Sequence, residues 1–150
     1  MKVVIIGASG FVGCYLAYEL ESAGHSVIKT DLPELDLLNA AQVDAFVANH
    51  SPDAVVNLAA ISSVRTSWIY PTNTISVNVN GTLNLLEAVR KHAPKAKTLL
   101  IGSAEEYAIP KGYKALKETD PLGASNPYGI SKIAQENFAQ LYRQKYGMSI

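Results

Sequence analysis

Cysteine, net charge and long apolar runs are scarce or absent in this 150-residue chain. The lone cysteine, Cys14, excludes an intrachain disulfide framework and is typical of a reducing compartment, so we expect a cytoplasmic protein. Lysine plus arginine (13) balance aspartate plus glutamate (13). This balance argues against nucleic-acid and anionic-membrane binders, because both need a basic field. No apolar run approaches the roughly 18 residues of a membrane span, and the apolar stretch after Met1 is too short for a secretory signal.

The remaining composition is that of a folded domain, with 48% hydrophobic and 17% charged residues. Short aliphatic runs alternate with helical patterns along it. We predict strands at Lys2–Ile6, Ser26–Thr30, 54–58 and 98–101, helices at 11–23, 40–49, 73–91 and 128–146, a loop at 108–127, and the opening of another strand at 148–150. This alternation predicts right-handed crossovers and a parallel sheet with helices on both faces.

Three glycines follow the first predicted strand at a regular spacing, in Gly7-x-x-Gly10-x-x-Gly13. Gly7 allows a tight turn, and Gly10 lets backbone amides approach a pyrophosphate. Gly13 lets the following helix pack closely on the strand. A glycine triplet alone is weak evidence, since it also fits a structural turn.

Asp31 ends the second predicted strand, 18 positions after Gly13. A carboxylate here can accept from both adenosine ribose hydroxyls and repels a 2′-phosphate, which favours NAD(H) and leaves NADP(H) possible. The alternative is a turn residue before Pro33. Asp36 could accept from the adenine amino group, or could stand near a helix start as a cap. The pattern predicts a Rossmann-type, doubly wound NAD(P)-binding domain over residues 1–150.

Tyr128 and Lys132 stand four residues apart at the start of a predicted helix and share one face. The ammonium lowers the pKa of the phenol, which could then exchange a proton with an alcohol or alkoxide. Ser103 follows a strand end, where ligands of such sheets bind, and could donate to a substrate oxygen. Glu105 could act as a second base or be a solvated loop carboxylate. The histidines form no ligand cluster with Cys14 or the carboxylates, so we predict no metal site.

These motifs, with Asn57-Leu58-Ala59-Ala60 and Asn78-Val79-Asn80-Gly81-Thr82, resemble the extended short-chain dehydrogenase/reductase (NAD-dependent epimerase/dehydratase) family over essentially all 150 residues. Segments 62–68 and 101–107 are most similar to its GDP-sugar branch, the GDP-mannose 4,6-dehydratases and GDP-4-keto-6-deoxymannose reductases. The sequence Gly-Ser-x-Glu-Glu-Tyr favours the reductases. Ala108 departs from the family pattern, and so does Ala104, which removes one possible sugar contact and so weakens the dehydratase assignment.

The resemblance implies a role for each matching residue. Ser103, Tyr128 and Lys132 match the catalytic triad, and Glu105 matches the base that removes the C5 proton in dehydratases. The implied cofactor-binding residues are Gly7, Ser9, Gly10, Phe11, Val12, Gly13, Asp31, Asp36, Leu37, Asn57, Leu58, Ala59, Ala60, Asn78, Tyr128 and Lys132. The implied substrate-binding residues are Ser62, Ser63, Arg65, Ser103 and Glu105.

The resemblance implies hydride transfer at C4 of a GDP-linked 4-keto-6-deoxyhexose. A 4,6-dehydratase or nucleotide-sugar 4-epimerase is the alternative within the family. A non-catalytic dinucleotide-binding module or an inactive fragment is the alternative from another class. Family members are roughly twice this long, so we expect the N-terminal part of a longer protein, without the C-terminal substrate lobe. Helices 73–91 and 128–146 match those of the family's dimer contact, which makes a homodimer possible.

Overall fold

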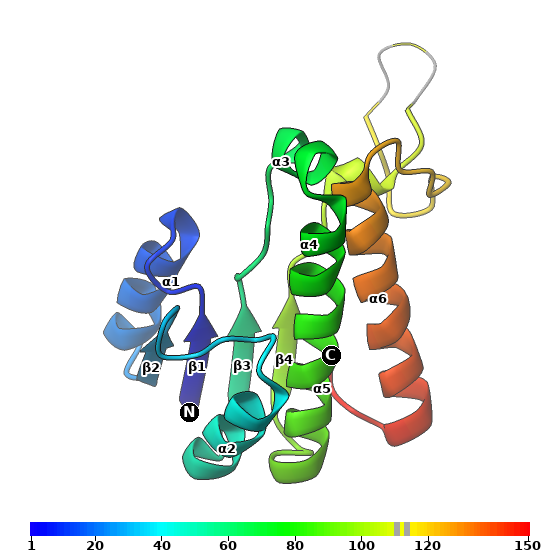
Figure 1. Ribbon diagram of the computed structural model, residues 1–150. Coiled ribbons are helices and arrows are strands. Elements are labelled where there is room, and N and C mark those ends of the chain that lie inside the picture. Colours follow the sequence, from blue (N-terminus) through cyan, green and yellow to red (C-terminus); the bar gives the residue numbers. More distant parts are fainter. Residues whose placement is uncertain (110–111, 113–114) are drawn as a thin grey trace.

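The computed structural model of the chain describes residues 1–109, 112 and 115–150 (Figure 1). Its strands are β1 (Lys2–Ile6), β2 (Ser26–Thr30), β3 (Ala54–Asn57) and β4 (Lys97–Leu100). Its helices are α1 (Phe11–Ser22), α2 (Ala40–His50), α3 (Val64–Ile69), α4 (Pro71–Ile75), the π-helical η1 (Ser76–Asn80), α5 (Gly81–His92), the 3-10 turn η2 (Ala104–Glu106) and α6 (Pro127–Tyr146).

The four strands form one parallel sheet in the order β2-β1-β3-β4. In this register Ile6, at the end of β1, lies opposite Thr30 of β2 and Asn57 of β3. The chain passes from β1 outward to β2 and then returns to the other side of β1 as β3. The sheet therefore has its topological switch point between β1 and β3, where open parallel sheets bind ligands at the carboxyl ends of the strands.

Helices cover both faces of the sheet, which confirms the predicted fold class (Figure 1). Successive strand residues point to opposite faces. Val4 packs with the α2 and α5 residues Val43 and Leu86, whereas Ile5 packs with Ala17 of α1. Helix α6 lies beside α5, where it contacts α3, α4, η1 and η2 rather than the middle of the sheet (Figure 1).

The prediction of one helix over 73–91 is wrong in detail. The segment starts at Pro71 and contains a π-helical turn, Ser76–Asn80, between α4 and α5. Apolar periodicity could not show this, because the widened turn keeps the helix continuous. The short elements α3 and η2 were also not predicted, since each is shorter than the window over which periodicity is readable.

Smaller differences concern element ends, which shift by at most two residues, as expected for such boundaries. Helix α6 starts at Pro127, with Asn126 as its cap. The expected strand opening at 148–150 is supported, because the Thr98 amide donates to the Ser149 carbonyl (2.8 Å). Within the predicted loop 108–127, residues 110, 111, 113 and 114 lie outside the described residues.

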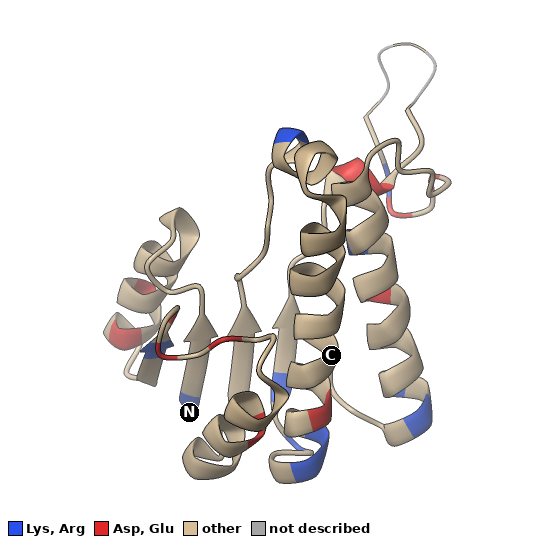
Figure 2. Ribbon diagram, viewed as in Figure 1, with Lys and Arg blue, Asp and Glu red and all other residues tan. Residues whose placement is uncertain are grey.

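Acidic and basic positions are interspersed over the described elements (Figure 2). This mixture agrees with the formal charge of zero. In the described part of the chain, no helix combines the length and the hydropathy that crossing a membrane would need.

Candidate active site

The glycine loop after β1 is shaped by backbone contacts. Gly7 has a positive φ of +84°, and a Cβ on it would lie 2.9 Å from the Ala59 nitrogen. A Cβ on Gly13 would lie 2.6 Å from the Ala8 Cα and would also meet the Gly7 carbonyl. Both positions therefore require glycine even in the free protein, Gly7 for its turn and Gly13 for the packing of α1 on the loop.

Gly10 differs from the other two glycines. A Cβ there would meet only the Gly7 oxygen, at 3.2 Å. Gly10 begins α1 as an extended N-cap with no side-chain cap, and the next residues, Phe11 and Val12, are 84% and 56% exposed. The first amides of a helix lack intrahelical acceptors and carry its positive dipole end. This backbone surface fits the pyrophosphate of a dinucleotide.

A cleft of about 570 Å³ opens at the switch point, beside the glycine loop. Nine of the predicted cofactor-binding residues line it: Gly7, Ser9, Gly10, Asp31, Asp36, Leu37, Leu58, Ala59 and Ala60. Its remaining lining was not predicted and consists of Ile6, Leu32, Leu35, Leu38, Ile61, Asn73 and Val77. These mostly apolar residues come from segments as far apart as Ile6 and Val77, which the fold brings to one cleft.

Two carboxylates, Asp31 and Asp36, line this cleft. The Oδ2 of Asp31 accepts from the Ser9 amide at 2.6 Å, which fixes the end of β2 against the glycine loop. The Oδ1 of Asp36 accepts from the Leu38 amide at 2.9 Å, a local turn, while Asn39 is the cap of α2. Asp31 is thus oriented by the same loop that presents the amides, as ribose recognition next to a pyrophosphate would require.

A second group of predicted residues gathers at the end of β4, on the same carboxyl edge of the sheet. Ser103 caps η2: its Oγ accepts from the Glu105 amide (3.2 Å). The Glu105 carboxylate accepts from the Asn126 side chain (2.7 Å), and Asn126 accepts from the Gly129 amide at the start of α6. These bonds join η2 to the first turn of α6 and bring Ser103 and Glu105 to the N-terminus of the helix that carries Tyr128.

Lys132 is buried beneath this turn, with only 4% of its surface exposed. Its Nζ donates to the Ile101 carbonyl (2.8 Å) and to Gln135 (3.3 Å), and lies 5.9 Å from the centre of the Tyr128 ring. Desolvation by burial lowers the pKa of Lys132, and the charges of Glu106 and Glu136 oppose that shift. The ammonium is therefore fixed close to the Tyr128 ring.

The cleft and the group of residues beyond the end of β4 lie at the same carboxyl edge of the sheet but are separate from each other. Ser103, Glu105, Tyr128 and Lys132 do not line the cleft. Two strand spacings, about 10 Å, separate β1 from β4, since β3 lies between them. An extended ligand held by the glycine loop would have to cross the end of β3 to reach Tyr128.

Two predicted asparagines form hydrogen bonds with the backbone of residues that line the cleft. Asn57 accepts from the Ala59 amide (3.1 Å). Asn78 is fully buried; it accepts from the Ile61 amide (2.8 Å) and donates to the Ile61 carbonyl and to Ser131 Oγ. The π-helical turn that contains Asn78 thus connects the cleft wall with the residue before Lys132.

The predicted substrate-binding residues at 62–65 lie on the surface after β3. The Ser63 hydroxyl caps α3 by accepting from the Thr66 amide (3.1 Å), while Ser62 and Arg65 are exposed. None of these three residues lines the cleft. Their contact with a substrate stays a prediction.

Sequence reasoning missed Glu106, which is 2% exposed and accepts from the Ser103 amide at 2.6 Å. The signal was available, because Ser103-x-x-Glu106 is the spacing of a capping box. Asn126-Pro127 likewise has the sequence pattern of a helix start. Burial raises the pKa of Glu106, and the Ser103 amide opposes this shift. Within the described residues, no group of three or more histidines, cysteines or carboxylates has the arrangement of a metal site.

A family model, described as the NAD dependent epimerase/dehydratase family, matches residues 3–150. The chain belongs to this family. A dTDP-glucose 4,6-dehydratase of Xanthomonas campestris is 30% identical over 98% of this chain and 50% of its own length.

Solved structures that are similar to this chain agree with this family assignment. The UDP-glucose 4-epimerase of Thermus thermophilus, solved with NAD, has a TM-score of 0.88 and is 30% identical, covering 99% of this chain and 52% of its own. RMD from Pseudomonas aeruginosa, solved with NADPH, has a TM-score of 0.85 and is 29% identical. The match covers 98% of this chain and 50% of that structure's chain. The chain thus spans about half the length of the relatives it matches.

Proposed function

We propose that this chain binds NAD(H) and carries the proton-transfer residues for oxidation or reduction at C4 of a nucleotide-linked hexose. One observation carries the proposal: a buried ammonium, Lys132, is held 5.9 Å from the ring of Tyr128 at the edge of the sheet that also presents the glycine loop. A dinucleotide-binding protein without chemistry has no need of a phenol beside a buried cation.

The residues present fit the nicotinamide dinucleotide. The amides beside Gly10 would hold the pyrophosphate, and Asp31 would accept from the adenosine ribose. The bound cofactor supplies or accepts the hydride. Relatives have been solved with NAD and with NADPH; the carboxylate of Asp31 favours NAD(H) here, because it would repel a 2′-phosphate.

The proton steps fall to this chain's own side chains. Tyr128 would exchange the proton at the C4 oxygen, with Lys132 favouring the phenolate. Ser103 would donate to the same oxygen and stabilise the charge that develops on it. Glu105 would hold or remove a proton at C5 in the dehydratase version of the reaction. These assignments follow the family positions that the four residues match.

We further propose reduction of a GDP-linked 4-keto-6-deoxyhexose as the specific reaction, on the similarity of segment 101–107 to such reductases. A 4,6-dehydratase or 4-epimerase is the second candidate, favoured by relatives that carry these names. Net consumption of NADH with a 4-keto sugar nucleotide would support the reductase. Redox-neutral conversion of a GDP-, dTDP- or UDP-sugar would support the second candidate.

The decisive experiment compares Tyr128→Phe with the unchanged protein. The variant should lose turnover by about 10²–10⁴-fold while its affinity for NADH, measured by fluorescence titration, stays nearly the same. Tyr18→Phe, at an exposed position on α1, is the matched control and should keep both. Binding of NADH without turnover on any tested sugar nucleotide would favour a non-catalytic dinucleotide-binding module, and tighter binding of NADPH would contradict the role of Asp31.

A homodimer through the segment 71–92 and α6 is part of this proposal. Ile130 and Leu141 on α6 are 49% and 56% exposed, which leaves apolar surface on the helix that the family resemblance implicates. Sedimentation should show a dimer that Leu141→Glu converts to a monomer.

A further inference from the structure

Two residues just after β4 are held by buried polar side chains. The Ile101 carbonyl accepts from Lys132 (2.8 Å) and Gln135 (3.1 Å). The Ser103 amide donates to Glu106 (2.6 Å). This short segment thus joins Lys132 to Ser103, and Glu106 is one of the side chains that fix it.

Gly102, between these two residues, is flanked by two carboxylates. A Cβ on Gly102 would lie 2.7 Å from the Glu136 Oε1 and 3.1 Å from the Glu106 Oε1. Both oxygens therefore converge on one point beside the backbone that Lys132 binds. Glu106 comes from η2 and is 2% exposed, whereas Glu136 comes from α6 and is exposed.

A buried carboxylate at this place is costly unless it has a compensating charge. Lys132 provides one, and the benefit is mutual, since an ammonium that is 4% exposed also needs negative charge to stay ionised. Glu106 and Glu136 are the charged groups that favour the ionised form of Lys132.

The other charged groups on elements packed against α6 offer no substitute. On η2, Glu105 is exposed. The remaining elements packed against α6 are α3, α4, η1 and α5. Neither α4 nor η1 contains a charged residue, and the charged residue of α3, Arg65, is exposed and of the wrong sign. On α5, Glu87 is paired with Arg90 and Tyr142 near the other end of α6.

We propose that Glu106 is a positioning residue that fixes Ser103 through its backbone amide and, together with Glu136, supplies the negative charge that keeps the Lys132 ammonium protonated. It touches neither substrate nor cofactor in this role. Its importance for catalysis rests on the proposed function, because Lys132 is there the group that favours the Tyr128 phenolate.

The test follows the Lys132 ammonium directly, by side-chain ¹⁵N NMR of the lysine-labelled chain, with the signal assigned from Lys132→Arg. Each glutamine substitution removes one of the two carboxylates beside the backbone that Lys132 binds. Glu106→Gln and Glu136→Gln should therefore each lower the midpoint of the Lys132 titration, by about one pH unit. Glu19→Gln on α1 makes the same change of charge at an exposed site and should leave the midpoint where it is.

A second readout separates positioning from charge. Glu106→Gln keeps an oxygen acceptor, so the Ser103 amide should stay protected from hydrogen exchange, whereas Glu106→Leu should lose that protection. If Glu106→Leu does not fold, Glu136→Gln at its exposed position still tests the charge effect. An unchanged Lys132 midpoint in both glutamine variants would overturn the proposal.

Titration of the same samples with NADH distinguishes the two proposals. If the unchanged chain fails to bind NADH, the proposed function fails, while the Lys132 midpoints still decide the role of Glu106. If NADH binds and the midpoints do not move, only the role of Glu106 is lost.

Discussion

The two regions of the site are built differently, although they lie on one edge of the sheet. Around Gly7, Gly10 and Gly13 the geometry depends on backbone atoms and on the absence of a Cβ in glycine. At the end of β4 it depends on buried polar side chains, chiefly Lys132 and Glu106, which bond to the backbone of 101–103. Both regions join residues that are distant in sequence: a Cβ on Gly7 would meet Ala59, and Lys132 donates to a carbonyl 31 positions away.

The comparison explains what each region tolerates. The glycine loop is destabilised when a Cβ is added at Gly7 or Gly13, since backbone atoms already occupy that space. A buried polar cluster is destabilised when a side-chain group is removed, since its partner is then left without a hydrogen bond. The following changes break or sharpen this contrast, from the largest expected effect to the smallest.

Gly13→Ala should cause the largest loss of stability, about 3 kcal/mol. The added Cβ would lie 2.6 Å from the Ala8 Cα, and the gain in helix propensity of about 1 kcal/mol is too small to offset this clash with backbone. Urea unfolding measures the change. A loss no greater than that of Gly10→Ala would show that α1 can move away from the loop.

Asn78→Ala should lower the free energy of unfolding by about 2 kcal/mol, because it leaves the Ile61 amide and carbonyl without their partner. Asn137→Ala, at an exposed position of α6, is the matched control and should change stability little. Equal losses in the two variants would remove Asn78 as the link between the cleft wall and α6.

Gly10→Ala should separate binding from stability. Since the new Cβ meets only the Gly7 oxygen, at 3.2 Å, unfolding should change by at most about 1 kcal/mol. The affinity for NADH should fall by about tenfold, roughly 1.4 kcal/mol, because the methyl group would occupy the approach to the loop amides. Unchanged NADH affinity would place the pyrophosphate elsewhere.

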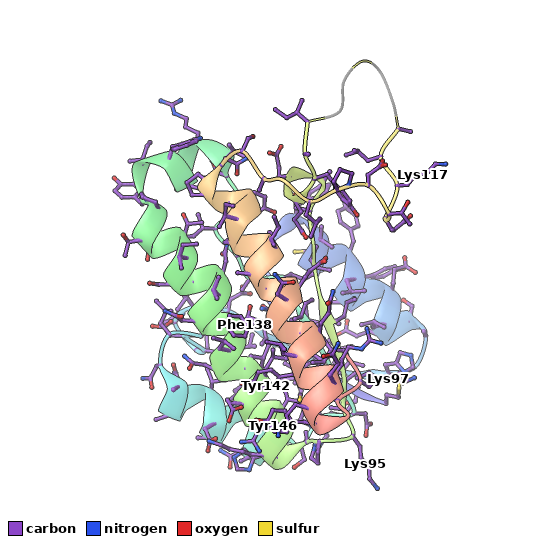
Figure 3. The ribbon with its side chains drawn as sticks, turned by 90° about the vertical axis from the view of Figure 1, so that its right-hand side faces the viewer. Lys95, Lys97, Lys117, Phe138, Tyr142 and Tyr146 are labelled. Atoms are coloured by element: carbon purple, nitrogen blue, oxygen red, sulfur yellow. The ribbon has the colours of Figure 1, made fainter. Side chains whose placement is uncertain are left out.

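Tyr142→Phe should have the smallest effect, below about 1 kcal/mol near neutral pH. The Tyr142 hydroxyl donates to Glu87 (2.7 Å), and Glu87 also pairs with Arg90. The Arg90 guanidinium lies 4.9 Å from the centre of the Tyr146 ring. Tyr142 and Tyr146 follow one another along α6 (Figure 3). This contact joins α6 to α5 far from Tyr128. Urea unfolding of the variant and the unchanged protein measures the difference.

The same contact has a defined pH dependence. Burial and the Glu87 carboxylate raise the pKa of Tyr142 to about 12, above its unfolded value of about 10. The stability from the protonated phenol is therefore fully present below pH 10 and is lost as the pH rises through 12. The difference between Tyr142→Phe and the unchanged protein should shrink over that window, and a constant difference would argue against the hydrogen bond.

Most of the fold could be read from the sequence, because strand and helix periods are local. The alternation of runs such as 2–6 and 26–30 with helical patterns led to the parallel sheet. The glycine spacing, the carboxylate pattern and the family resemblance together led to nine residues that share one cleft. The π-helical turn at 76–80 could not be read, since apolar periodicity does not reveal it and Asn78 within it bonds to residues 17 and 53 positions away.

The amino-acid sequence by itself determined the alternation of strands and helices, the glycine loop and the four-residue spacing of Tyr128 and Lys132, since each depends on neighbours within a few turns of chain. Only the tertiary structure decided that Glu106, Gln135 and the carbonyl of Ile101 surround Lys132. Burial and charge are properties of what surrounds a group, and the groups around Lys132 come from β4, η2 and α6, which only folding brings together.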